Sequence, residues 1–314
     1  MTAPGRIAVE QGSQAWLDAR RQLVTATDLG VLLGINPWRC EADLADEKLH
    51  GTQQEPSLRM RAGNAMEPLI REAYQEQTGR RLLRYHGLLT HPDYPWAAAS
   101  PDYRVVGEPG LMEAKYSTSR ARFADGLPQE IQAQAIWQAA ITGAEWVDVA
   151  VFLVDELVVT RVAADPALFA DLLLVAEDFR RRLVSGGPFV RDAARVRRDH
   201  PADDGSEIAA DNDVAEAVRA LLDTRASRKR LEEDEERLET AIKARMADAA
   251  AMTGPGWRIT WKRTKDRDET DWKAVAASLL ATLSETDRAT AVAPHTVVRP
   301  GFRPFRVTLD KETE

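Results

Sequence analysis

Two short stretches decide the fold of this chain: SPD at residues 100–102 and LMEAK at residues 111–115. Side chains on a strand alternate between its two faces, so Glu113 and Lys115 share one face if the second stretch is a strand. With Asp102 they form the arrangement Asp…Glu-x-Lys, which is typical of a divalent-metal nuclease. Carboxylate oxygens suit that role because they are hard ligands of the kind that Mg²⁺ prefers.

The spacing by itself is weak evidence, because two acids and a lysine this close together occur by chance in many chains as a surface ion pair. The surrounding sequence favours a hairpin. Residues 96–99 and 103–106 have the pattern of short strands, and GEPG at 107–110 has the residues of a tight turn. On such a hairpin Asp102 and Glu113 lie on facing arms, where both can reach one ion.

Helical and strand patterns alternate around this hairpin. A proline begins the predicted helix at 128–141, and Asp165 with Pro166 begins the next one. The order predicts a mixed sheet with helices on its faces, an α/β or α+β fold. The other expected helices span residues 13–23, 29–33, 42–49, 60–77 and 166–184, and the other strands span 81–90, 147–153 and 157–162.

Length and composition set limits on the class of protein. The chain has 314 residues, of which 44% are hydrophobic, enough for one large domain or two ordinary ones. The net charge of −8 argues against a uniformly basic protein that coats nucleic acid, but not against a nuclease whose carboxylates are neutralised by metal ions. Cys40 is the only cysteine, which fits a reducing cytosol. No signal peptide or membrane span is visible, so we expect a cytoplasmic protein, in a bacterial host if a phage or prophage encodes it.

A shift in composition marks the second half of the chain. A long helix is expected from residue 214 to about residue 250. Its centre, at residues 225–237, alternates in charge like a solvated coiled-coil arm. Beyond it, residues 257–263 and 297–309 have strand patterns, and 271–280 has a helical one. The expected parts are a nuclease domain (1–195), a charged linker (196–212), the long helix (213–252) and a small αβ tail (253–314).

Two features of the predicted helices have competing interpretations. Glu67 lies within the apolar face of the helix at 60–77, where a carboxylate is costly unless it is paired or bound to a metal. An ion pair with Arg61 or Arg71 is the simpler interpretation. The glutamines of the helix at 128–141 similarly have the ordinary interpretation of a solvated face.

With these pieces in place, the chain from about Glu10 to Phe189 resembles the YqaJ-type viral recombinase family. This family includes the alkaline exonuclease of bacteriophage lambda and belongs to the restriction-endonuclease-like, PD-(D/E)xK nucleases. The match is an ordered series. It comprises EQG at 10–12 with AW at 15–16, Arg20 and VTATD at 24–28, then GNAME at 63–67, SPD and LMEAK, and QAQ at 132–134 with Trp137.

The resemblance implies a role for each matching residue. It implies Mg²⁺ as cofactor, with Mn²⁺ expected to substitute, and it leaves Gln134 and Gln138 nearer to the surface interpretation. Thr27 stands at a serine position of the family and keeps its hydroxyl. The implied sites are catalytic Glu67, Asp102, Glu113, Lys115 and Gln132; metal ligands Asp102, Glu113, the Ala114 carbonyl and Glu67; and Arg20 with Thr27 on a DNA phosphate.

The expected function is therefore that of a Mg²⁺-dependent phage-type exonuclease acting on the ends of linear duplex DNA in recombination. A structure- or site-specific endonuclease on the same core is one alternative. A DNA-binding accessory protein without catalysis is another, which the charged helix and the basic, aromatic stretches near the C-terminus favour. Family analogy adds a single-strand annealing protein and a homo-oligomer as possible partners, and no membrane partner is expected.

Overall fold

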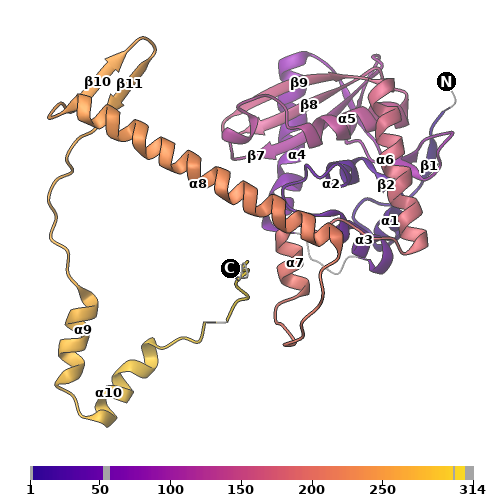
Figure 1. Cartoon of the computed structure of the whole chain (residues 1–314). Coiled ribbons are helices and arrows are strands. Elements are labelled where there is room, and N and C mark those ends of the chain that lie inside the picture. Colours follow the sequence, from indigo (N-terminus) through magenta and orange to yellow (C-terminus); the bar gives the residue numbers. More distant parts are fainter. Residues whose placement is uncertain (1–2, 52–56, 300, 308–314) are drawn as a thin grey trace. The chain divides into compact units, whose positions relative to one another are not determined.

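The computed structural model describes residues 3–51, 57–299 and 301–307, and it divides the chain into two compact units, Met1–His200 and Pro201–Glu314 (Figure 1). The helices of the first unit are α1 (Gln14–Arg21), α2 (Leu29–Leu32), α3 (Glu41–His50), α4 (Leu58–Thr78), α5 (Gln129–Thr142), α6 (Pro166–Ser185) and α7 (Ala193–Asp199). Its strands are β1 (Gly5–Ile7), β2 (Val24–Thr25), β3 (Leu82–Arg84), β4 (Leu88–Thr90), β5 (Ala97–Ala99), β6 (Tyr103–Val105), β7 (Gly110–Ser117), β8 (Trp146–Leu153) and β9 (Glu156–Ala163).

A five-stranded sheet in the order β3-β6-β7-β8-β9 forms the centre of the first unit. β7 pairs antiparallel with β6 and parallel with β8, whereas β8 and β9 form an antiparallel hairpin. A second sheet has the order β1-β4-β5-β2. The expected mixed α/β fold is thus confirmed, and the Asp…Glu-x-Lys stretches lie at the antiparallel β6–β7 junction.

Helices cover both faces of the five-stranded sheet. Leu111 of β7 packs with Ile131 and Ala135 of α5, while the next residue, Met112, packs with Ile70 and Tyr74 of α4 on the opposite face. The strand period of two therefore assigns odd-numbered residues of β7 to α5 and even-numbered ones to α4. This alternation decides which side chains can meet at the site.

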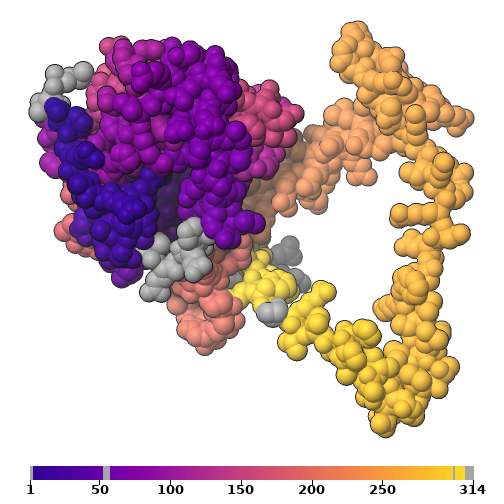
Figure 2. Space-filling model, turned by 180° about the vertical axis from the view of Figure 1, so that it is seen from behind, coloured from indigo at the N-terminus to yellow at the C-terminus, as the bar shows by residue number. Residues whose placement is uncertain are grey.

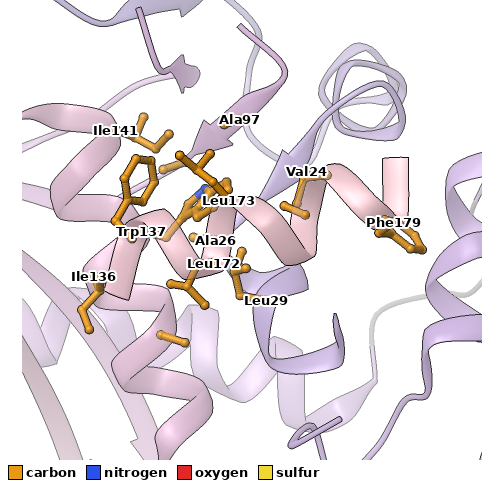
Figure 3. Packing of buried hydrophobic residues seen from close by; sticks show 14 of the residues in the cluster. Val24, Ala26, Leu29, Ala97, Ile136, Trp137, Ile141, Leu172, Leu173 and Phe179 are labelled. Carbon is orange, nitrogen blue, oxygen red and sulfur yellow. The ribbon is translucent and has the colours of Figure 1, made fainter. Parts of the chain in front are cut away.

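The other side of α5 belongs to the largest hydrophobic core. Trp137 is fully buried there, its ring centroid lies 5.2 Å from that of Phe169, and its indole N–H donates to the Ala98 carbonyl. Figure 3 shows how Leu172 and Leu173 lie around it. With both sides packed, α5 is a rigid element on which to place polar side chains.

One predicted strand divides into two. Residues 81–90 form β3 and β4, which belong to different sheets, rather than one strand. Gly87 lies between them at φ +83°, where a Cβ would meet the Ile7 carbonyl oxygen at 2.4 Å. Only glycine adopts this conformation readily, so the chain bends there and changes sheet.

Figure 2 shows the face on which the N-terminal residues (indigo) lie beside the segments that follow them (purple).

The second unit contains helix α8 (Asn212–Met246), strands β10 (Ala251–Gly254) and β11 (Trp257–Thr260), and helices α9 (Trp272–Ala281) and α10 (Glu285–Val292). The expected strand at 297–309 is wrong for its described part, because 297–299 and 301–307 contain no strand; residues 300, 308 and 309 lie outside the described residues. None of the described helices is long and apolar enough to cross a membrane.

The predicted linker begins too early, because residues 196–199 lie in helix α7. The Asp192 side chain caps this helix, and Arg195 pairs with Asp199 along it. Arg195 also pairs with Asp43 and Asp46 of α3. The charged run at this point therefore belongs to the first unit through its ion pairs.

Candidate active site

Strand pairing sets the position of the two predicted carboxylates. Tyr103 of β6 lies opposite Met112 of β7, so Asp102, directly before β6, and Glu113 of β7 flank this pair. The Ala114 N–H donates to Asp102 Oδ2 at 2.9 Å. This hydrogen bond fixes the first carboxylate against the strand that carries the second.

The buried carboxylate of Glu113 accepts hydrogen bonds from several side chains. The side chain is nearly buried, and a carboxylate in that position is costly unless hydrogen bonds satisfy it. Its Oε1 accepts from Lys115 Nζ at 2.8 Å and from Gln134 Nε2 at 2.6 Å. Its Oε2 accepts from Gln138 Nε2 at 2.8 Å. Lys115 Nζ also donates to Gln134 Oε1 at 3.0 Å, so these four side chains form one network.

The charges of this network influence one another. Burial and the neighbouring Glu113 carboxylate raise the pKa of Asp102 well above its usual 3.8, against the lowering effects of Lys115 and the Ala114 N–H. Burial lowers the pKa of Lys115, but Glu113 and Asp102 raise it by more, so the lysine stays charged. The two carboxylates thus repel each other in spite of the lysine, which is the electrostatic condition that a divalent cation relieves.

The expected role of Gln132 is corrected by the structure. Its side chain is exposed and its Nε2 donates to the Leu127 carbonyl, whereas Gln134 and Gln138 reach Glu113. At 100° per residue, Gln132 and Gln134 point about 160° apart around the helix, while Gln134 and Gln138 share a face. The four-residue spacing of Gln134, Gln138 and the pocket-lining Glu130 is the signal that could have identified this face.

Glu67 lies beside this network on the other face of the sheet. Its Oε1 accepts from the Tyr103 hydroxyl at 2.8 Å, and Arg84 lies 3.1 Å away from the same oxygen, so the partner is neither Arg61 nor Arg71. Burial and this hydrogen bond raise the pKa of Tyr103 to about 12. The charge of Glu67 still acts on Asp102. Among the described residues, no three acidic, histidine or cysteine side chains gather closely enough to hold a metal ion, so Glu67 does not complete a three-carboxylate group.

Arg20 and Thr27, which the resemblance assigns to a DNA phosphate, lie in contact with each other. Arg20 Nη2 donates to Thr27 Oγ1 at 2.9 Å, and its guanidinium stacks on Trp16, with Cζ 4.5 Å from the ring centroid. Thr27 also lines a pocket of about 230 Å³ together with Lys115 and Gln134. The Thr27 hydroxyl, which accepts from the Arg20 guanidinium, therefore lines a pocket that it shares with Lys115.

The oxygen donors suit a magnesium ion. Mg²⁺ is commonly held by one or two carboxylates and completes its shell with waters and substrate phosphates. Asp102, Glu113 and the Ala114 carbonyl would provide such a set. In addition, Gln138 Oε1 is a buried acceptor without a hydrogen-bond partner in the described part of the chain, which a water beside the ion would satisfy.

Fold and side chains together define a class. A mixed sheet between α4 and α5, with two carboxylates and a lysine at the junction of its antiparallel and parallel strands, is the arrangement of a restriction-endonuclease-like nuclease core. Residues 15–145 match the family of YqaJ-like viral recombinase domains, so the resemblance seen in the sequence is confirmed over these residues.

Several individual proteins are similar to the chain. The uncharacterized protein YqaJ of Bacillus subtilis (strain 168) is 26% identical over 112 residues, which span 35% of this chain and 35% of that protein. Among solved structures, an alkaline exonuclease (LHK-Exo) from Laribacter hongkongensis is 27% identical, with 55% of this chain and 94% of that one covered and a TM-score of 0.46. Its complex with dAMP covers 60% and 97% at 26% identity, with a TM-score of 0.47.

Proposed function

We propose that this protein is a Mg²⁺-dependent deoxyribonuclease that degrades linear duplex DNA from its ends, with Mn²⁺ as a substitute ion. The observation that carries the proposal is the grouping of Asp102, directly before β6, with Glu113 and Lys115 of β7 and Gln134 of α5. Its place within a YqaJ-like viral recombinase domain supports a role in phage-type recombination.

Each side chain has a distinct part in the proposed hydrolysis. Asp102, Glu113 and the Ala114 carbonyl would hold the cation, which would polarise the scissile phosphate and acidify the attacking water. Lys115 is held between Glu113 and Gln134, so its ammonium group is positioned to orient that water or to stabilise charge on a phosphate oxygen. Arg20 and Thr27 hold a neighbouring phosphate through charge-assisted hydrogen bonds. Glu67 acts on Asp102 through its charge.

Digestion of end-labelled linear duplexes and of a covalently closed circle, each with Mg²⁺ and with EDTA, tests this function. We expect the wild-type protein to degrade the linear duplex, to spare the circle and to stop in EDTA. Cutting of the closed circle would instead establish an endonuclease. Duplexes with and without a 5′-phosphate report whether Arg20 and Thr27 recognise that group.

An Asp102→Asn variant tests the assignment of the site. Asparagine keeps an oxygen that can accept the Ala114 N–H but lacks the charge, so cleavage should be abolished while the thermal melting curve stays near that of the wild type. Asp171→Asn, an exposed aspartate on α6, is the matched control and should cleave normally. Wild-type cleavage by Asp102→Asn would refute the metal site.

The second unit favours one further candidate function. Trp257 and Trp261 are each about half exposed at β11, close to Arg258 and Lys262, rather than buried in a core. Exposed aromatic and cationic side chains can stack on single-stranded bases. Binding of single-stranded DNA in EDTA, weakened in Trp257→Ala, would support an accessory binding role beside catalysis.

A further inference from the structure

The pocket beside Lys115 is lined by side chains of two kinds. Lys115, Gln134 and Thr27 belong to the candidate active site. Trp38, Phe123 and Arg122 line the same pocket and adjoin one another as an aromatic and cationic wall. The site residues account for phosphate chemistry, whereas an aromatic wall has no part in hydrolysis.

Trp38 is an exposed aromatic surrounded by cations. Its side chain is 55% exposed. The Arg122 guanidinium stacks on the indole with Cζ 4.5 Å from the ring centroid, and that of Arg59 lies 5.3 Å from it. Arg122 also lies 5.9 Å from the Phe123 ring. A single exposed tryptophan is ordinary, but flat rings and guanidinium planes on one pocket wall form a stacking surface.

This wall is built on fixed supports. Asn36 Oδ1 accepts the backbone N–H groups of Trp38 and Arg39 at 2.9 and 3.0 Å, which closes the turn that carries the indole. The N–H groups of residues 35 and 36 both donate to the Gly30 carbonyl. A Cβ at Gly30 would meet the Glu130 Cβ at 2.7 Å, so α2 and α5 approach closely here.

Arg122 is held in place by the same helix. It pairs with Glu130 at 2.5 Å, one turn before Gln134 on α5. Side chains of α5 therefore hold both the stacking wall, through Glu130, and the Glu113 network, through Gln134 and Gln138. A planar group in the pocket would contact this wall, and Lys115 and Thr27 line the same pocket, where they are available to an attached phosphate.

We propose that this pocket holds the base of the nucleotide whose phosphodiester is cut, stacked on the wall of Trp38 and Arg122. This inference rests on the proposed nuclease function. A nucleobase is the planar group that DNA attaches to a phosphate through one sugar, and stacking accepts all four bases because each has a π-face. The pocket thus favours the presence of a base at the cleavage site without selecting its identity.

The test compares an intact terminal nucleotide with an abasic one. Linear duplexes carry a tetrahydrofuran abasic residue at either terminus, and single-turnover release of the labelled end is measured with Mg²⁺ at the terminus that the wild type degrades. Loss of one base stack should slow the wild type about 5- to 100-fold. Trp38→Ala should slow cleavage of the intact end by a similar factor and show no further loss on the abasic end, because the two changes remove the same contact. Trp38→Phe keeps an aromatic face and should stay close to the wild type.

Arg180→Ala is the matched control. Arg180 also stacks on a tryptophan, Trp96, at 4.6 Å, but neither residue lines the pocket. It should keep both the wild-type rate and the full abasic penalty. Equal cleavage of intact and abasic ends by the wild type, or an unchanged abasic penalty in Trp38→Ala, would overturn the inference while leaving the nuclease function intact. Failure of the wild type to cut any duplex would instead overturn both.

Discussion

At the scale of single residues, the site depends on how a buried carboxylate is held. Glu113 is satisfied by Lys115 and by two glutamine amides that approach from α5. A carboxylate that is to bind a metal ion must keep one orientation, and outer hydrogen bonds supply that orientation. We therefore propose that Gln134 positions both Glu113 and Lys115.

Substitution of the two neighbouring glutamines separates a positioning residue from a surface one. Gln134→Met removes the hydrogen bonds to Glu113 and Lys115, and we expect the cleavage rate with Mg²⁺ to fall about 10- to 100-fold. Gln132→Met changes an exposed side chain that bonds only the Leu127 carbonyl among the described contacts, so its rate should stay within about twofold of the wild type. The reverse order of these two rates would contradict the geometry.

At the scale of elements, a buried ion pair joins α3 to the segment that carries Arg20 and Thr27. Lys48 Nζ of α3 donates to Asp28 Oδ2 at 2.7 Å and to the carbonyls of Arg20 and Leu23. Both side chains are almost completely buried. Removal of one partner from such a pair leaves an uncompensated group, which is strongly destabilising.

The stability contribution of this pair should depend on pH. Burial raises the pKa of Asp28, but Lys48, Arg20 and the Thr25 N–H together lower it below the usual 3.8. Because the folded pKa lies below the unfolded one, the stabilisation is present above about pH 4 and is lost as the pH falls through the folded value. Asp28→Asn should reduce the free energy of unfolding by about 3–5 kcal/mol at pH 7, with a difference from the wild type that narrows in acid.

Urea unfolding at pH 7 and at pH 3 measures this effect. Glu47→Gln removes the partner of Arg39 in a more exposed pair, 2.5 Å long, and serves as the control. Its effect should be about 0–1 kcal/mol. A pH-independent difference between Asp28→Asn and the wild type would exclude the ionised pair as its source.

Close packing also fixes how β7 lies against β8. Gly110 pairs with Trp146, and a Cβ at Gly110 would lie 2.2 Å from the indole. Gly110→Ala should therefore destabilise the fold by about 1–3 kcal/mol, measured as urea midpoint and slope.

Gly63 lies inside α4 with nothing within 4 Å of an added Cβ. Gly63→Ala should raise stability by about 0.5–1 kcal/mol, because alanine is the better helix former.

At the scale of the whole molecule, the chain divides between α7 and α8. Residues 201–211 have no regular secondary structure and are exposed. The proposed catalytic residues all precede His200. The first unit thus contains every group that the proposed chemistry uses.

Limited proteolysis tests this division. A glutamate-specific protease should cut at Glu207 before it cuts inside the first unit, because an exposed, unstructured segment is the preferred site of nicking. Mass spectrometry should identify a fragment ending there, and the nicked protein should retain Mg²⁺-dependent cleavage. Glu207→Gln should delay the cut. Initial cleavage inside the first unit, with loss of activity, would refute this organisation.

The sequence by itself determined the mixed α/β fold, the hairpin and the ordered motifs. These features depend on local periodicity, turn residues and spacing, so they can be predicted from the sequence. Asp102, Glu113 and Lys115 could be selected in this way because the strand period of two places the last two on one face.

Only the tertiary structure decided which neighbours meet them. Whether Gln132 or Gln134 faces Glu113 depends on the rotation of α5 about its axis, which packing of Trp137 and Ile131 on two different cores sets. The partners of Glu67 depend on which sheet face α4 covers, and the Trp38 wall depends on the close approach of α2 to α5. Such contacts join residues far apart in sequence, and their geometry follows from close packing in three dimensions rather than from any local pattern.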